Sequence, residues 1–132
     1  MATGTGDMAI LACKNIEELK VIGMDISPGM LDIGRKKVEK EGLQARIDLQ
    51  AGDSEAINYR ENTFDAVMVA FGVRNFEDLE KGLTEIRRVL KPGAMLVVLE
   101  FSRPRKFPMR QLYNFYFKNI LPGLGRLIYN DK

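Results

Sequence analysis

Two glycines near the start of the chain, Gly4 and Gly6 in ATGTGD, are the first residues whose type and spacing suggest a binding site. Glycine lets the backbone turn sharply and lets a ligand approach the main chain closely. A short helix is predicted over residues 7–15, so its first N–H groups would point into this turn. Such a turn suits a phosphate or a carboxylate, and the glycines alone do not decide between them.

Two acids then follow at the ends of two predicted strands. Asp25 ends the apolar run LKVIGMDIS, and Asp53 ends ARIDLQAGD. An acid about 20 residues after a glycine turn is spaced to accept hydrogen bonds from both ribose hydroxyls. Asp53, one strand further out, can accept from an exocyclic purine amino group. The pattern predicts a nucleoside site; the structural alternatives are a solvated acid, a turn-forming acid and packing glycines.

Strands and helices alternate along the whole chain, which predicts one α/β domain over residues 1–132 with a mainly parallel sheet. Ligands of such sheets bind at the carboxyl ends of the strands. Strands are expected over residues 19–27, 45–53, 63–72 and 94–102, and helices over 27–43, 75–94 and 109–120. The strand over 63–72 is nearly all apolar, which predicts burial on both faces, and the strand over 94–102 is also expected to be buried.

Helical periodicity also predicts which residues reach the core. The inner stripes of the helices over 27–43 and 75–94 are expected to comprise Met30, Leu31, Ile33, Gly34 and Val38, and Phe76, Leu79, Leu83, Ile86, Val89 and Leu90. The dipeptide Pro92-Gly93 is expected to end the second helix.

Composition excludes several classes of function. The 132 residues carry a net charge of +2, which gives no reason to propose nucleic acid as a partner, and they include no histidine and one cysteine. A zinc site is not expected, and a Ser-His-Asp or Cys-His nucleophile cannot be built from this chain. Cys13 is expected to be a buried thiol in a reducing compartment. Without a signal peptide or an apolar run of about 20 residues, the expected location is cytoplasmic.

The glycine turn leaves the identity of the nucleoside open. A dinucleotide fingerprint requires G-x-G-x-x-G, and Ala9 occupies the third position, which the G/A form permits. The chain as a whole is more informative. ATGTGD, GMDIS, AGDSE, FGVRNF, LTEIRRVLKPG and LEFSRP together resemble the ubiquinone/menaquinone biosynthesis C-methyltransferases over roughly residues 2–132.

The resemblance implies a Rossmann-like class I methyltransferase, a three-layer sandwich with a mostly parallel sheet. It implies S-adenosyl-L-methionine as the cofactor and a polyprenyl hydroquinone, either demethylmenaquinol or a 2-polyprenyl-benzoquinol, as the methyl acceptor. By the same resemblance Asp25 binds the ribose. The other implied cofactor contacts are Thr3, Gly4 and Gly6 at the methionine end and Asp53 and Ser54 beside the adenine.

The resemblance also places Arg74 and Asn75 next to the aromatic substrate. A guanidinium near a hydroquinone oxygen would favour the ionised form, and Asn75 could orient that oxygen. The structural alternative for Arg74 is a salt bridge to Glu77 or Asp78. The general base stays open: a water held by Asp53, Glu55 or Tyr59, or a residue outside this chain.

In the family a strand precedes the glycine turn, and further strands follow the position of Lys132. The resemblance therefore implies an incomplete sheet, in which residues 19–26 and 64–71 either pair directly or leave a gap for another chain. A homodimer or strand exchange, weak cofactor binding and little turnover are the expected consequences. An NAD-dependent oxidoreductase on a similar fold and a non-catalytic fragment are the alternative functions.

The segment from Phe107 onward mixes aromatic and basic residues. It could line the route of an isoprenoid chain, or touch an anionic membrane surface as a peripheral contact. The alternative is an amphipathic helix packed on the edge of the sheet.

Overall fold

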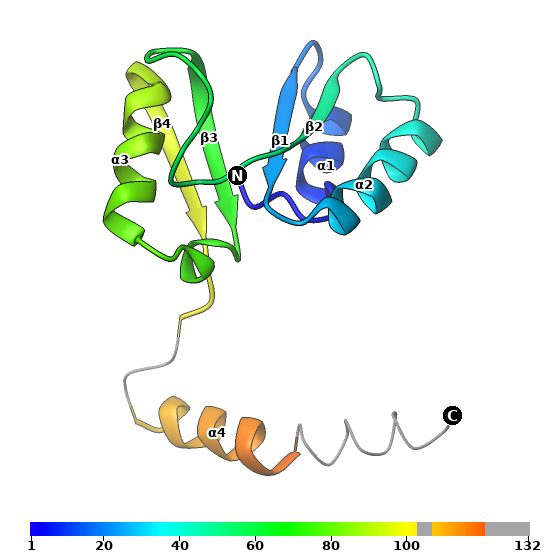
Figure 1. Ribbon diagram of the computed structural model, residues 1–132. Helices are drawn as coiled ribbons and strands as arrows, with labels where there is room; N and C mark the ends of the chain where they lie inside the picture. The colour runs from blue at the N-terminus through cyan, green and yellow to red at the C-terminus, as the bar shows by residue number, and fades with distance from the viewer. Residues whose placement is uncertain (103–106, 121–132) are drawn as a thin grey trace. The chain divides into compact units, whose positions relative to one another are not determined.

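A computed structural model describes residues 1–102 and 107–120 of the chain (Figure 1). It forms two compact units, Met1–Glu100 and Phe101–Lys132. The first unit has the expected α/β order. Its elements are α1 (Asp7–Asn15), β1 (Val21–Asp25), α2 (Pro28–Lys40), β2 (Ile47–Ala51), β3 (Phe64–Ala70), a 3₁₀ turn (Val73–Asn75), α3 (Leu79–Val89) and β4 (Leu90–Leu99).

The four strands form two separate parallel pairs, β1 with β2 and β3 with β4. Direct pairing of residues 19–26 with 64–71 is therefore not found. The first residues of the chain lie at these two edges instead. The amine of Met1 donates to the carbonyl of Met68 in β3 at 2.9 Å, and the N–H of Thr3 donates to the carbonyl of Met24 in β1 at 2.9 Å.

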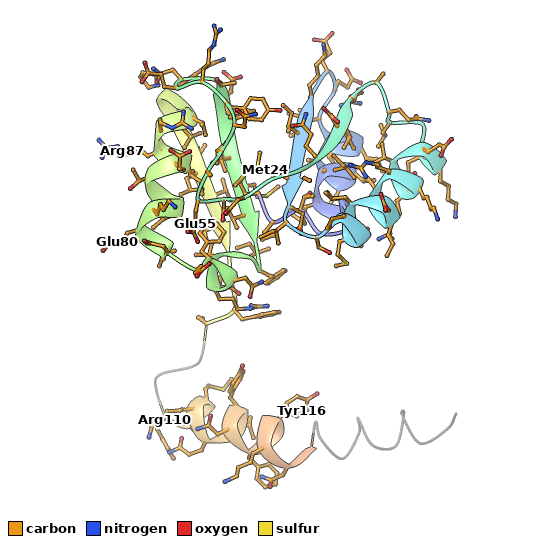
Figure 2. The ribbon with its side chains drawn as sticks, in the orientation of Figure 1. Met24, Glu55, Glu80, Arg87, Arg110 and Tyr116 are labelled. Atoms are coloured by element: carbon orange, nitrogen blue, oxygen red, sulfur yellow. The ribbon has the colours of Figure 1, made fainter. Side chains whose placement is uncertain are left out.

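Helices lie on both sides of the strands, as a three-layer arrangement requires. Alternate residues of β1 point to opposite faces. Val21 packs with α1 and α2 against a core that includes Leu31, whereas Met24 packs with β3 and α3 around Ile86. Figure 2 shows Met24 between the two pairs of strands. Cys13 is buried as expected, in the α1–α2 core.

The expectations that residues 63–72 are buried on both faces and that residues 94–102 form a buried strand are both wrong. In β3 only Val67 and Val69 are buried, and β4 exposes Met95 and Val97. Within Met1–Glu100, α3 packs on one face of the β3–β4 pair, against Val67, Val69 and Leu96, and Met95 and Val97 alternate with Leu96 on the other face. A run of apolar residues predicts a strand, but burial depends on what covers it.

The helix predicted over 75–94 is shorter at both ends. It begins at Leu79 because Asp78 caps it, accepting a hydrogen bond from the N–H of Lys81 at 3.0 Å. It ends at Val89, ahead of the predicted stop. Pro92 disfavours helical geometry at the residue before it, so the chain becomes extended, and an irregularity in the β3–β4 register follows.

The predicted core stripes are too wide. Leu31 and Val38 of α2 and Ile86 and Val89 of α3 are buried, as predicted. The apolar residues found exposed instead are Met30, Ile33, Leu79 and Leu83. Each helix contacts the strands along a narrow line. Ile33 lies on the far side of α2 from that line, and Leu79 is exposed in the first turn of α3.

The second unit contains α4 (Met109–Phe115), which continues into a π-helical turn (Tyr116–Ile120). The helix predicted over residues 109–120 is therefore confirmed. Within residues 1–102 and 107–120, no helix has both the length and the apolar character needed to cross a membrane.

Candidate functional site

The glycine turn and Asp25 are in direct contact. The N–H of Gly4 donates to Oδ2 of Asp25 at 2.7 Å, and the N–H of Ser27 donates to Oδ1 at 3.0 Å. Gly4 and Gly6 have φ values of 54° and 76°, in the left-handed region that favours glycine. The predicted convergence of these residues is therefore found, and the glycines serve the turn itself rather than packing alone.

Helix α2 packs against this turn and binds it through Lys37. A Cβ at Gly34 would lie 3.1 Å from the carbonyl carbon of Thr5, so the helix and the turn touch because residue 34 has no side chain. Lys37 donates to Oγ1 of Thr5 at 2.9 Å and to Oδ1 of Asp7 at 2.8 Å. Hydrogen bonds from Lys37 and then Thr5 hold the pKa of Asp7 below its ordinary value. Sequence reasoning missed Lys37, since nothing in its spacing links it to residues 30 positions away.

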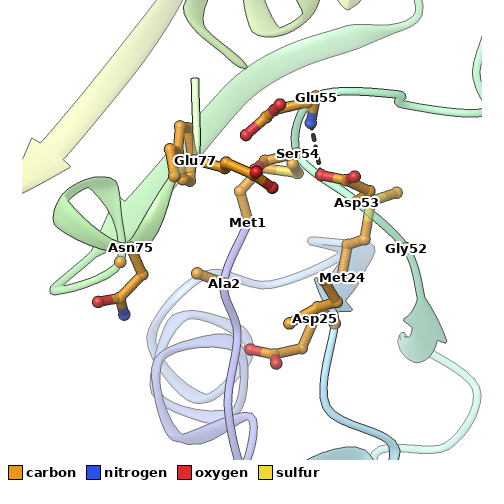
Figure 3. Close-up of a pocket in the computed structure, with 13 residues that line it drawn as sticks. Met1, Ala2, Met24, Asp25, Gly52, Asp53, Ser54, Glu55, Asn75 and Glu77 are labelled. Atoms are coloured by element: carbon orange, nitrogen blue, oxygen red, sulfur yellow. Dashed lines mark hydrogen bonds between the residues drawn. The ribbon is translucent and has the colours of Figure 1, made fainter. Parts of the chain in front are cut away.

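A pocket of about 210 Å³ opens beside Asp25 (Figure 3). It contains four of the predicted site residues and several that were not predicted. Its lining comprises Met1, Ala2, Met24, Asp25, Ile26, Gly52, Asp53, Ser54, Glu55, Gly72, Asn75, Phe76 and Glu77. Figure 3 shows Met1 and Ala2 between Asn75 on one side and Asp25 on the other. Of the predicted set, Thr3, Gly4, Gly6 and Arg74 do not line it.

The pocket is acidic. Asp25, Asp53, Glu55 and Glu77 line it together with Met1, which carries an α-amine, and within the described part of the chain no lysine or arginine side chain lines it. Like Asp25, two more of these carboxylates accept hydrogen bonds from the main chain: Asp53 Oδ1 accepts from the N–H of Glu55 at 2.8 Å, and Glu55 Oε1 accepts from the N–H of Asp78 at 2.7 Å. Such a lining favours a ligand with positive charge. No group of residues fit to hold a metal ion occurs in the described ranges, 1–102 and 107–120.

Comparison with known proteins assigns the chain to a family. The model of the ubiE/COQ5 methyltransferase family matches residues 1–132. The chain belongs to the ubiE/COQ5 methyltransferase family. The resemblance inferred from ATGTGD, FGVRNF and LEFSRP is thereby confirmed.

Individual members of the ubiE/COQ5 family are similar over nearly the whole chain. A demethylmenaquinone methyltransferase of Bacteroides fragilis is 51% identical over 99% of this chain and 54% of its own length. A ubiquinone/menaquinone biosynthesis C-methyltransferase of Geobacter sulfurreducens is 44% identical over 96% of this chain and 50% of its own. The chain thus spans about half the length of the curated relatives it matches.

Solved structures agree with the fold. A SAM dependent methyltransferase from Aquifex aeolicus superposes with a TM-score of 0.72 at 27% identity, over 83% of this chain and 60% of that one. The class I methyltransferase fold expected from the sequence is therefore confirmed, although its strands here form two separate parallel pairs.

Arg74 and Asn75 of this ubiE/COQ5 family member lie in the 3₁₀ turn that follows β3. Asn75 lines the pocket, whereas the guanidinium of Arg74 forms an ion pair with Glu100. The expected alternative partners, Glu77 and Asp78, are not the ones used. Arg74 and Glu100 meet because each follows the end of one of two neighbouring parallel strands, a proximity that sequence spacing does not reveal.

Helix α3 holds the loop that forms one wall of the pocket. Arg88 donates to the carbonyls of Tyr59 at 2.7 Å and Ile57 at 2.8 Å, and Glu85 accepts from the N–H of Ile57 at 2.9 Å. Glu85 and Arg88 are themselves paired at 2.7 Å. This pair was not predicted; its i, i+3 spacing suggests only an ordinary surface salt bridge.

We expect Glu85→Gln to lower the free energy of unfolding by about 1 kcal/mol, because the charged acceptor of two hydrogen-bonded groups is lost. Arg88 and then the Ile57 N–H lower the pKa of Glu85, so its contribution is present above the ordinary glutamate pKa of about 4.3 and is lost as the pH falls below it. Urea unfolding of both proteins at pH 7 and at pH 3 measures this. Glu80→Gln, an exposed change on the same helix, is the control. An equal loss at both pH values would contradict the prediction.

Proposed function

We propose that the pocket beside Asp25 binds S-adenosyl-L-methionine. The single observation that carries this proposal is the contact between the glycine turn and Asp25 at the edge of a pocket lined by four carboxylates. S-adenosylmethionine has a sulfonium and an ammonium group against one carboxylate, so it carries a net positive charge that suits this lining. Membership of a methyltransferase family supports the same ligand.

The expected roles follow the order of residues along the pocket. Asp25 would accept hydrogen bonds from the ribose hydroxyls, since its oxygens retain lone pairs after binding Gly4 and Ser27. Asp53 and Ser54, on the loop after β2, would lie beside the adenine. Thr3, Gly4 and Gly6 do not line the pocket; their turn binds Asp25 through the N–H of Gly4 and would border the methionine end of the ligand.

A dinucleotide fits this pocket less well. NAD carries two phosphates, and four nearby carboxylates would repel them. The glycine turn alone permits either ligand, so the acidic lining is what favours the sulfonium cofactor over NAD.

Thermal shift and calorimetric titration test this proposal, with S-adenosylhomocysteine, S-adenosylmethionine and NADH as ligands. We expect both adenosyl ligands to bind, and NADH to have no effect. The pocket volume of about 210 Å³ is below the roughly 300 Å³ typical of small-molecule sites, so we expect weak binding, with a Kd of about 0.1–1 mM. Equal stabilisation by NADH would overturn the assignment.

We further propose that the protein takes part in C-methylation of a polyprenyl hydroquinone, with demethylmenaquinol as the preferred acceptor. The relative at 51% identity is named for demethylmenaquinone alone, and the one at 44% for both quinones. When bound, S-adenosylmethionine supplies an activated methyl group. The residues of the chain then mainly align donor and acceptor. Asn75 would orient a hydroxyl of the ring, with the Arg74–Glu100 pair beside it.

A chimera tests the acceptor. Residues 1–132 would replace the matching stretch of the Bacteroides fragilis relative, and methyl transfer from labelled S-adenosylmethionine would be measured on demethylmenaquinol and on a 2-polyprenyl-benzoquinol. We expect transfer to the naphthoquinol to be faster, and Asn75→Ala to reduce it by about 10- to 100-fold, the loss of an oriented hydrogen bond. Faster transfer to the benzoquinol would contradict the substrate assignment while leaving the cofactor proposal intact.

A further inference from the structure

Over residues 109–116 the helix has one apolar and one polar side. Arg110, Asn114 and Lys118 are spaced four residues apart, so they form a single polar stripe. The opposite side carries Met109, Leu112, Tyr113, Phe115 and Tyr116, followed by the polar Asn119. Leu112 is 63% exposed and Phe115 is 58% exposed. Figure 2 shows Arg110 and Tyr116 on this helix. Apolar residues of this size are costly to leave in contact with water.

Charge is divided unevenly between the two units. Residues 101–132 contain seven lysines and arginines and one acid, whereas residues 1–100 contain 13 basic and 17 acidic residues. The second unit therefore carries +6 and the first −4, although the chain as a whole is nearly neutral. A partner that attracts the second unit electrostatically must be anionic, and it must also accept an apolar helix face.

We propose that the helix over residues 109–120 binds an anionic lipid bilayer in the plane of its surface. Its apolar side enters the boundary between headgroups and acyl chains, while Arg110 and Lys118 remain among the anionic headgroups. A nucleic acid would satisfy the charge but would leave the apolar side in water. This inference extends the proposed function, because a polyprenyl hydroquinone is itself dissolved in a bilayer. Binding to lipid requires neither cofactor nor acceptor, so the two proposals can fail separately.

The rival location for the apolar side is within the chain. The β3–β4 pair exposes the apolar residues Met95, Val97 and Leu99, which could also accept a helix. The two locations make opposite predictions. A helix packed on the strands contributes to the free energy of unfolding, whereas a helix that binds lipid does not.

The test is co-sedimentation of the whole chain with vesicles of phosphatidylcholine alone and of phosphatidylcholine with about one third phosphatidylglycerol. We expect binding to the anionic vesicles only, weakening as salt is raised. The double change Arg110→Gln with Lys118→Gln should reduce this binding by roughly 10- to 30-fold, at about fivefold per charge. Lys36→Gln with Lys40→Gln, which removes the same charge from exposed positions of α2, should leave it unchanged.

A second variant separates the lipid surface from the rival explanations. Leu112→Asn with Phe115→Asn should abolish vesicle binding without changing the melting temperature. A lower melting temperature with no vesicle binding by the parent chain would overturn the proposal in favour of packing on β3–β4. Undiminished binding by this variant would also overturn it, since the attraction would then be to negative charge alone, as for a nucleic acid.

Discussion

Asp25→Asn is expected to weaken binding of S-adenosylhomocysteine by about 10- to 100-fold. A hydrogen bond to a charged acceptor contributes about 1.5–3 kcal/mol, and the ribose would lose its charged acceptor. The substitution also places an amide NH₂ where the N–H of Gly4 or Ser27 now donates, so the glycine turn loses one of its two fixed contacts. Calorimetric titration at a temperature where both proteins are folded measures the effect.

Two further variants serve as a comparison and a control for the Asp25→Asn measurement. Asp53→Asn changes the adenine side of the pocket without touching the glycine turn, so a smaller loss is expected there. Asp32→Asn alters an exposed acid of α2 that pairs with Arg35, and it should leave the affinity unchanged. If Asp25→Asn bound the ligand as tightly as the parent chain, Asp25 would not be a ribose ligand.

Gly34→Val is expected to lower the free energy of unfolding by about 3 kcal/mol, because it forces apart two segments that touch. A Cβ at this position would lie 2.7 Å from Cδ1 of Leu49, which is buried, and 3.1 Å from the main chain of Thr5. Since Thr5 belongs to the glycine turn, the same change should displace the turn from α2. Urea unfolding, followed by titration of the folded fraction, would report both effects.

Gly29→Ala in the same helix is the matched control. Nothing lies within 4 Å of a Cβ built at Gly29, and alanine is the better helix former. We expect this variant to be as stable as the parent chain or to gain up to about 1 kcal/mol. Gly34→Val and Gly29→Ala proteins of equal stability would show that α2 does not need a bare backbone at residue 34.

The glycine turn and Asp25 are features of the site that local sequence patterns predict. Positive φ at Gly4 and Gly6 and a strand ending at Asp25 are both consequences of short stretches of sequence, so both were predictable. That they meet follows from the general rule that the carboxyl ends of parallel strands share an edge. The same rule correctly brought Asp53, Ser54 and Asn75 to the pocket.

Burial was less predictable, because it depends on neighbours that local sequence does not identify. Met95 and Val97 belong to an apolar strand, yet they are exposed, because they alternate with Leu96 on the face that points away from α3. Leu79 and Leu83 continue the apolar stripe of α3 but are exposed, Leu79 at the first residue of the helix and Leu83 to the side of its contact line. In both cases the pattern correctly predicts the element and overestimates its contacts.

The sequence by itself determined the order of helices and strands, the glycine turn, the acids at the strand ends and the family to which the chain belongs. These follow from residue type and spacing over a few turns or one strand. Only the tertiary structure decided that four carboxylates face one pocket, that Arg74 pairs with Glu100, and that Lys37 and Arg88 hold the turn and the loop around it. Such contacts join residues 26 to 32 positions apart, and their geometry is set by the packing of whole elements rather than by any local preference.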